Sequence, residues 1–295
     1  MTGFTVEDIT PVERERSSPL SGMFVLSPWV WREEGLYKLL VRAVNPSEDA
    51  SQKVARIYYG SSNDGLHFRM DDGPAIAPGT HDDKDGCEDP TLERSDGRYY
   101  VYYSGWDETK KVGQLMLAVG ETVDDLKKRG VVIQSTETHK NPKEATLVAA
   151  EDGSWRLFFE YASGASKIGV ASAPAVDGPW TIQAPLFEAR SGSWDSYHLS
   201  TGPIVPGDAP VMFYNGADEN AHWRIGWVAF DKTYSKVVGR SEDPLIVPPP
   251  GEPGDTDIAF AASSVVEEHS ISLYYSVADK AIFRATLLGG SKMSS

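Results

Sequence analysis

Five segments of the chain share one pattern, an aromatic or aliphatic stretch that ends on a small or polar residue. They are YKLLVRA (37–43), YYVYYSG (99–105), WRLFFEY (155–161), PVMFYNG (210–216) and ISLYYSV (271–277). Aligned on their sixth residues, they recur at intervals of 55 to 62 residues and account for the whole length of 295 residues. A repeat of this period indicates similar units that pack on one another, because a single unit cannot bury its apolar face alone.

Each unit contains further strand-like pieces. A short apolar stretch precedes the shared segment, turn residues such as Ser95-Asp96-Gly97 join the two, and a third strand follows. No long stretch has helical periodicity, and Glu121–Arg129 is the best short candidate. Strand units repeated at this spacing predict an all-β chain, folded as a five-bladed β-propeller with an axial active-site funnel.

We expect a single domain over residues 1–295. The blades are predicted at residues 27–80, 86–135, 141–190, 198–248 and 257–288, and the N-terminal segment before Ser27 is expected to add the outer strand of the fifth blade and close the ring. Two β-sandwiches are the alternative, which fits the even spacing less well.

The charge balance narrows the classes of partner. The chain has 28 Lys and Arg against 43 Asp and Glu, a formal net charge of −15, which argues against nucleic acid and anionic membranes. The start, MTGFTVEDIT, has no signal-peptide pattern, and Cys87 is the only cysteine. We therefore expect a cytoplasmic protein without nucleic-acid or membrane partners, and a homo-oligomer remains open.

The repeat also predicts where a site lies. In a propeller, the starts of the inner strands and the ends of the second strands ring the same mouth of the channel. This brings together carboxylates, an arginine and several hydroxyl or amide groups, with aromatic residues close in sequence. The inner-strand starts are Ser27, Asp89, Glu144, Ser200 with Thr201, and Ala261; the aligned residues are Arg42, Ser104, Glu160, Asn215 and Ser276; the aromatic residues are Trp29, Tyr103, Trp106 and Trp194.

That combination suits a sugar, because aromatic rings cover C–H faces while carboxylate, amide and guanidinium groups bind hydroxyls. Two carboxylates facing one cavity are also what cleavage of a glycosidic bond requires, and Asp89 and Glu144 sit at equivalent positions of consecutive units. The chain has no phosphate-binding loop, dinucleotide fingerprint, HExxH or CxxC motif, so we expect an oligosaccharide substrate with no cofactor and no metal.

Several of these segments resemble one known family. Gly86-Cys87-Glu88-Asp89-Pro90 followed by YYVYYSGWD resembles the Gly-x-Glu-Asp-Pro signature of glycoside hydrolase family 130, the β-mannoside phosphorylases and β-mannosidases. LLVRA, the NDGLHF turn, the run from Arg240 to Pro248 and LYYSVADKAI also resemble family segments, in the same order, from about residue 27 to 287.

The resemblance implies a five-bladed propeller and an inverting reaction on β-mannosides. It implies that Asp89 is the acid, acting through a sugar hydroxyl as proton relay. It also implies that Arg42, Asp64 and Asp279 hold the non-reducing sugar.

Two positions depart from the family's phosphorylases. Glu160 and Asn215 stand where those enzymes carry an arginine and a histidine for phosphate. A carboxylate there would repel phosphate by about 4 kcal/mol at 4 Å and an effective dielectric of 20. We therefore expect hydrolysis, with Glu160 as the base, and Glu144 and Asp195 as the other candidates.

Three alternatives stay open. One is a phosphorylase that binds phosphate through Lys143, Arg190, His198 or His222. Another is an arabinanase- or xylosidase-like enzyme, although Ser27 stands where those families carry an aspartate base. The third is a sugar-binding propeller without catalysis. Tyr103, Trp106, Asp195, His198 and Asn215 are further candidates for the walls of the pocket.

Overall fold

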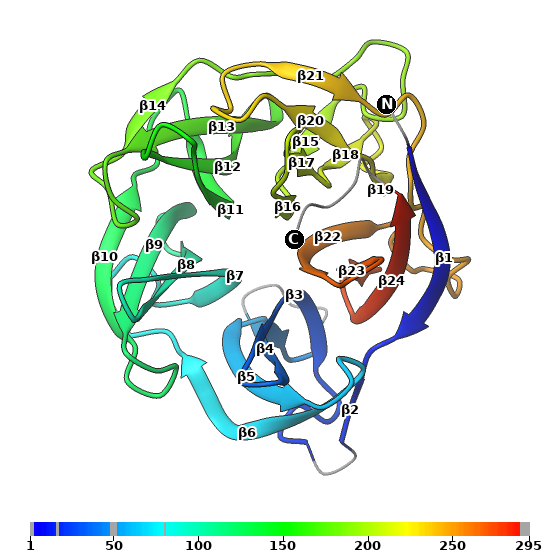
Figure 1. Ribbon diagram of the computed structural model, residues 1–295. Coiled ribbons are helices and arrows are strands. Elements are labelled where there is room, and N and C mark those ends of the chain that lie inside the picture. The colour runs from blue at the N-terminus through cyan, green and yellow to red at the C-terminus, as the bar shows by residue number, and fades with distance from the viewer. Residues whose placement is uncertain (1–2, 16–17, 48–51, 80, 290–295) are drawn as a thin grey trace.

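The computed structural model describes residues 3–15, 18–47, 52–79 and 81–289, and every regular element in these ranges is a β-strand (Figure 1). The all-β prediction is confirmed. Within the same ranges there is no helix that could cross a membrane. Residue 80, where the first predicted unit ends, lies outside the described residues.

Hydrogen bonding divides the strands into six sheets arranged around a common centre (Figure 1). Five of them have four or five strands each, and one has three. The first has the order β2-β6-β5-β4-β3, with β2 (Glu13–Arg14), β3 (Phe24–Glu33), β4 (Leu36–Val44), β5 (Arg56–Ser62) and β6 (His67–Ile76). The second has the order β10-β9-β8-β7, with β7 (Gly86–Ser95), β8 (Arg98–Asp107), β9 (Val112–Gly120) and β10 (Lys127–Ile133). The third runs β11-β12-β13-β14, with β11 (Lys140–Ala149), β12 (Trp155–Ser163), β13 (Ala165–Ala173) and β14 (Thr181–Gln183).

The fourth repeat is divided between two smaller sheets. One contains β15 (His198–Ser200), β18 (Asn215–Ala217) and β19 (Trp223–Ile225); the other contains β16 (Ile204–Val205), β17 (Val211–Met212), β20 (Val228–Phe230) and β21 (Val237–Arg240). Backbone bonds from Phe213 N to Pro203 O (2.9 Å) and from Gly226 N to Tyr214 O (3.0 Å) bridge the stretches between them. These bonds join the two sheets, because β15 leads directly into β16, β17 into β18, and β19 into β20.

The last sheet joins the two ends of the chain. Its order is β1-β24-β23-β22, with β1 (Phe4–Pro11), β22 (Ala259–Val266), β23 (Ile271–Val277) and β24 (Ala281–Gly289). The N-terminal segment is thus its outer strand, as the sequence predicts.

The five aligned residues occupy one position in the strand pairing. Each is paired with a residue of the inner strand that lies at, or directly before, the strand start expected from the sequence. The pairs are Leu26 with Arg42, Glu88 with Ser104, Lys143 with Glu160, Ser200 with Asn215, and Phe260 with Ser276. The alignment of the repeats is therefore correct at the level of single residues.

A bulge follows this pair in the first three repeats. The register shifts directly after Leu26, Glu88 and Lys143. The next residues, Ser27, Asp89 and Glu144, have φ values of 52°, 50° and 53°. Positive φ is uncommon for residues other than glycine, and a bulge bends a strand and redirects a side chain. The same backbone feature thus sets three polar side chains at corresponding places.

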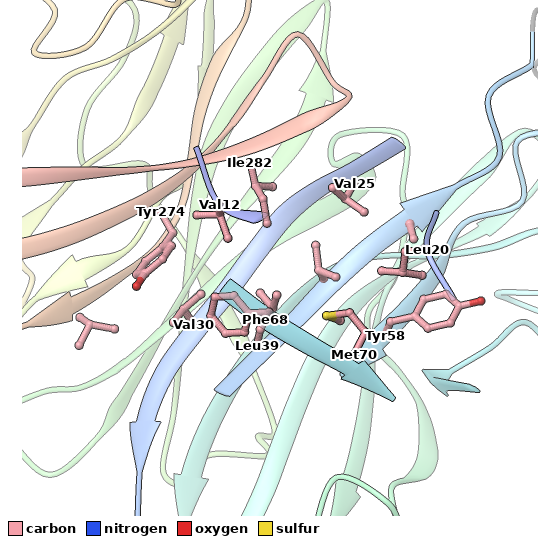
Figure 2. Close-up of a cluster of buried hydrophobic side chains, with 13 residues drawn as sticks. Val12, Leu20, Val25, Val30, Leu39, Tyr58, Phe68, Met70, Tyr274 and Ile282 are labelled. Atoms are coloured by element: carbon pink, nitrogen blue, oxygen red, sulfur yellow. The ribbon is translucent and has the colours of Figure 1, made fainter. Parts of the chain in front are cut away.

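A buried cluster joins the first sheet to the last (Figure 2). Leu39, Phe68 and Met70 from the first sheet pack with Tyr274 and Ile282 from the last. The Tyr274 ring is fully buried, and its hydroxyl donates a hydrogen bond to Gly65 O at 3.0 Å. Packing between the first and last sheets therefore closes the ring of sheets. Strand β1 closes it a second time, by hydrogen bonding to β24 in the last sheet.

Removing the Tyr274 ring should weaken this closure. We expect Tyr274→Ala to lower the free energy of unfolding by about 3–5 kcal/mol, the usual cost of deleting a buried aromatic ring. Tyr274→Phe removes only the hydrogen bond to Gly65 and should cost about 1 kcal/mol. Urea unfolding of both variants measures the difference; equal costs would contradict a closure that depends on packing.

Candidate active site

Two neighbouring cavities of about 280 and 520 Å³ lie where the sheets converge. Arg42, Lys53, Lys143 and Glu160 line both of them. The first cavity is also lined by Phe24, Leu26, Ser27, Val44, Glu144, Trp223, Ile258, Phe260, Ser276 and Asp279. The second is also lined by Asp85, Glu88, Ser104, Gly105, Trp106, Glu108, Gly113, Asn141, Pro142, Ala162 and Ser166. All five repeats therefore contribute to one composite site.

Asp89 is almost fully buried, with 3% of its surface exposed, and lines neither cavity, but it bonds to three residues that do. Its Oδ1 accepts hydrogen bonds from Ser27 Oγ at 2.8 Å and Arg42 Nη1 at 3.1 Å. Its Oδ2 accepts one from Ser104 Oγ at 3.2 Å. Burial by itself raises the pKa of Asp89, but the charges of Arg42 and Lys143 outweigh it and leave that pKa below its ordinary value. The substrate-free site therefore holds Asp89 ionised.

Arg42 connects the two acidic residues of the Glu-Asp-Pro segment. Its Nη2 lies 3.1 Å from Glu88 Oε1 while its Nη1 contacts Asp89. Burial raises the pKa of Glu88 despite this contact. Arg42 Nε is buried and has no hydrogen-bond partner among the described residues, so one donor remains for a ligand.

Glu144 differs from Asp89 in its protonation. Its side chain lines the first cavity, and its backbone carbonyl accepts a hydrogen bond from Thr201 Oγ1. Burial and the neighbouring charge of Asp89 hold the pKa of Glu144 well above its ordinary value. Glu144 therefore keeps its proton to a higher pH than an ordinary glutamate.

Glu160 stands on the wall that the two cavities share and is only 3% exposed. Its Oε1 accepts a hydrogen bond from Ser166 Oγ at 2.7 Å and lies 3.4 Å from Lys143 Nζ. Lys143 is also its partner in the strand pairing, and the charge of Glu160 raises the pKa of Lys143. Glu160 Oε2 is buried without a partner in the described part of the chain.

The structure brings five of the eleven predicted site residues to the cavity walls. Arg42, Glu144, Glu160 and Asp279 line the first, and Trp106 lines the second. Burial raises the pKa of Asp279.

His198 lies beside the site without lining either cavity. Its Nδ1 accepts a hydrogen bond from Ser166 N at 3.0 Å, and its ring stacks on Trp223 at 5.6 Å. Burial lowers the pKa of His198, which keeps the imidazole neutral to lower pH.

Four predicted binding residues lie off the cavity walls, with their polar atoms occupied by the fold. Asp64 holds an exposed turn by accepting hydrogen bonds from Leu66 N and His67 N. The Tyr103 hydroxyl donates to the buried Asp83. Asp195 forms ion pairs with Arg190 and Arg240, and the Asn215 amide bonds to the backbone of Thr201 and Ala261.

These contacts also remove two of the groups considered for phosphate. Arg190 is engaged by Asp195, and His222 is engaged by Asp218 at 2.9 Å. Neither residue lines the two central cavities.

Sequence reasoning missed Lys53, Trp223 and Phe260. Lys53 lines both cavities and has no ion pair or hydrogen bond among the described residues. It follows the first repeat's second strand in an irregular segment, where no periodicity points to it. Trp223 could have been found, since it begins the third strand of the fourth unit. No cluster of His, Cys, Asp and Glu in the described ranges could hold a metal ion.

Comparison with known proteins finds one family throughout. A family model described as beta-1,4-mannooligosaccharide phosphorylase matches residues 38–288. The chain is 27% identical over 265 residues to a 1,2-beta-oligomannan phosphorylase of Thermoanaerobacter sp. (strain X514), covering 86% of each chain. It is 26% identical over 239 residues to a beta-1,2-mannobiose phosphorylase of the same organism, covering 79% of this chain and 76% of that one.

Solved structures have the same fold. A Listeria innocua beta-1,2-mannobiose phosphorylase, in complex with beta-1,2-mannobiose, superposes with a TM-score of 0.78 at 20% identity, covering 97% of this chain and 96% of that one. Another structure has a TM-score of 0.78 at 20% identity, covering 96% of this chain and 93% of that one. It comes from work on glycoside hydrolases, within the family of mannoside phosphorylases, that target beta-1,2 mannosidic linkages in Candida mannan.

The raised pKa of Glu144 predicts a pH-dependent stability. An acid whose pKa rises on folding stabilises the folded state below its unfolded pKa, and this contribution is lost as pH rises through the folded pKa. Wild-type stability should therefore fall from about pH 4.5 upward, by about 1.4 kcal/mol for each unit of raised pKa, while Glu144→Gln escapes this fall. Urea unfolding across pH 4–9, with the exposed Glu219→Gln as control, measures the effect; parallel curves for wild type and Glu144→Gln would contradict it.

Proposed function

Because the chain belongs to glycoside hydrolase family 130, we propose that it cleaves the β-mannosidic bonds of short oligosaccharides. The observation that carries the proposal is the family match over residues 38–288 together with buried carboxylates facing a composite cavity. The curated relatives at 27% and 26% identity carry the names of phosphorylases acting on β-1,2-linked mannosides, which makes that linkage the first to test.

We also propose that the sheets form one five-bladed propeller domain. The backbone bonds of Phe213 and Gly226 support counting the two small sheets as one blade. The equivalent pairing of all five aligned residues supports five units around one axis. A cytoplasmic location belongs to the same proposal and rests on the charge and the single cysteine.

In the proposed mechanism, Asp89 and Glu144 together transfer the catalytic proton. Two carboxyl groups whose pKa values are pushed apart are suited to acid and base roles. Asp89 is held ionised and Glu144 retains a proton. Protonated Glu144 supplies the proton, which passes through Asp89 and a sugar hydroxyl bonded to it to the glycosidic oxygen, leaving Glu144 ionised. The acceptor attacks the anomeric carbon from the opposite face as the bond from that carbon to the glycosidic oxygen breaks.

We propose phosphate as the acceptor, which reverses the hydrolysis expected from the sequence. The names of the relatives favour it, and the contacts of Glu160 weaken the argument against it. Lys143 lies 3.4 Å from the Glu160 carboxylate and offsets its charge, whereas the expected repulsion assumed an isolated charge. Lys53, on the wall of both cavities, forms no ion pair within the described ranges, and its charge acts on Asp279.

Water is the second candidate acceptor, and one observation favours it. Glu160 lines both cavities, and its buried Oε2 has no donor among the described residues. A carboxylate oxygen in that state can accept the proton of an attacking water.

An assay of acceptor dependence tests the proposal directly. With β-1,2-mannobiose as substrate, we expect turnover only when inorganic phosphate is added, with release of mannose 1-phosphate. Equal turnover in phosphate-free buffer, with release of mannose, would replace phosphorolysis by hydrolysis. Absence of turnover across β-1,2- and β-1,4-linked mannosides would overturn the proposed function.

The variant Glu160→Gln separates the two acceptors by the direction of its effect. Under phosphorolysis, loss of the negative charge should lower the KM for phosphate severalfold, because attraction from Lys143 and Lys53 is no longer opposed. Under hydrolysis, loss of the base should lower kcat by about 10²–10⁴-fold. Steady-state kinetics against phosphate concentration measure both, with Glu219→Gln as the control. A raised KM for phosphate would contradict the proposed acceptor site.

A further inference from the structure

A third cavity, of about 150 Å³, adjoins the second central one. It is formed between the start of β13 and the segments on either side of residue 190, and it is lined by Ser166, Lys167, Ile168, Pro185, Phe187, Glu188, Ala189, Tyr197 and Leu199. Ser166 also lines the second central cavity, so the two hollows share a wall. Its volume is about five times the share of one water in the liquid, about 30 Å³, which leaves room for more than an isolated solvent molecule.

A chain of contacts connects this cavity to the reacting groups. Ser166 donates its hydroxyl proton to Glu160 at 2.7 Å and its backbone N–H to His198 at 3.0 Å. The His198 ring meets Tyr197 edge to face at 4.7 Å between centroids. These contacts connect the wall between the second and third cavities to Glu160 in the central site.

Tyr197 is unusual among the aromatic residues. It is 43% exposed, and the other large hydrophobic side chains that are exposed in the described ranges are aliphatic. A partly exposed aromatic ring beside a cavity offers a platform for an amphipathic ligand.

The three cavities share one chemical composition, an aromatic ring beside a lysine and a glutamate. The first has Trp223, Lys53 and Glu144; the second has Trp106, Lys143 and Glu88; the third has Tyr197, Lys167 and Glu188. Rings cover the apolar faces of a sugar and the charged groups bind its hydroxyls. The third cavity thus repeats the recognition chemistry of the other two without the buried acid pair.

We propose that the third cavity is a sugar subsite for one unit beyond the two that flank the scissile bond. The chain accordingly acts better on oligosaccharides of three or more units than on disaccharides, with Tyr197 as the stacking residue. The subsite rests on the proposed function, because it takes the same substrate class as the central cavities.

The variant Tyr197→Ala tests the subsite. Wild type should show a higher kcat/KM for β-1,2-mannotriose than for β-1,2-mannobiose. Tyr197→Ala should lose about 3- to 10-fold on the trisaccharide, the range of one ring contact, and leave disaccharide kinetics unchanged. Tyr197→Phe keeps the ring and should retain the preference, and Val247→Ala, an exposed and remote substitution, is the matched control.

The outcomes separate the subsite from the proposed function. Equal losses on both substrates, or no loss on either, would overturn the subsite while cleavage itself stands. Isothermal titration calorimetry of wild type and Tyr197→Ala with the two sugars gives a readout that does not need turnover. Loss of trisaccharide affinity in Tyr197→Ala, in a chain that cleaves neither sugar, would support the subsite and remove the enzymatic assignment.

Discussion

The site depends on one backbone feature, the bulge with positive φ at the start of the inner strand. Ser27, Asp89 and Glu144 all adopt it, and each such residue carries a strain of about 1–3 kcal/mol that the surrounding sheet must offset. The bulge interrupts the alternation of side chains along the strand and turns these three toward the centre. A single conformation, repeated in three sheets, thereby delivers a hydroxyl and two carboxyl groups to one place.

The electrostatics of the site follow from this convergence. Five carboxyl groups, from Glu88, Asp89, Glu144, Glu160 and Asp279, surround three cations, from Arg42, Lys53 and Lys143. Burial disfavours the charged forms, so the groups with fewer donors, Glu144 among them, have raised pKa values. Asp89 accepts hydrogen bonds from the Arg42 guanidinium and from two serine hydroxyls, and it stays ionised. Protonated and ionised acids in one site are what general acid catalysis on a sugar needs.

Much of this arrangement could be predicted from the sequence. The aligned residues Arg42, Ser104 and Glu160 line the central cavities, as the recurrence of one strand position at a nearly constant interval predicts, whereas the predicted binding residues Asp195 and Asn215 do not. The polar atoms of Asp195 are bound by Arg190 and Arg240, and the Asn215 amide is bound by Ala261. These contacts depend on tertiary packing, which the strand pattern does not indicate. Lys53 lies outside the repeated strands, so no sequence pattern indicates that it belongs to the site. A pairing of Glu160 with Lys143 can be considered from the sequence, but the register that sets these two residues opposite each other comes from the structure.

That pair changes the argument about the acceptor. A glutamate in place of a phosphate-binding arginine excludes phosphate only while its charge is uncompensated, and here Lys143 supplies the compensation. The buried Oε2 of Glu160 still requires a donor, because an unsatisfied carboxylate oxygen is costly. Water and hydrogen phosphate both carry an O–H that meets this requirement. Hydrogen phosphate also brings the negative charge that Lys53 can bind, and a hydrogen bond from its O–H to Glu160 reduces, without removing, the repulsion between the Glu160 carboxylate and the anion.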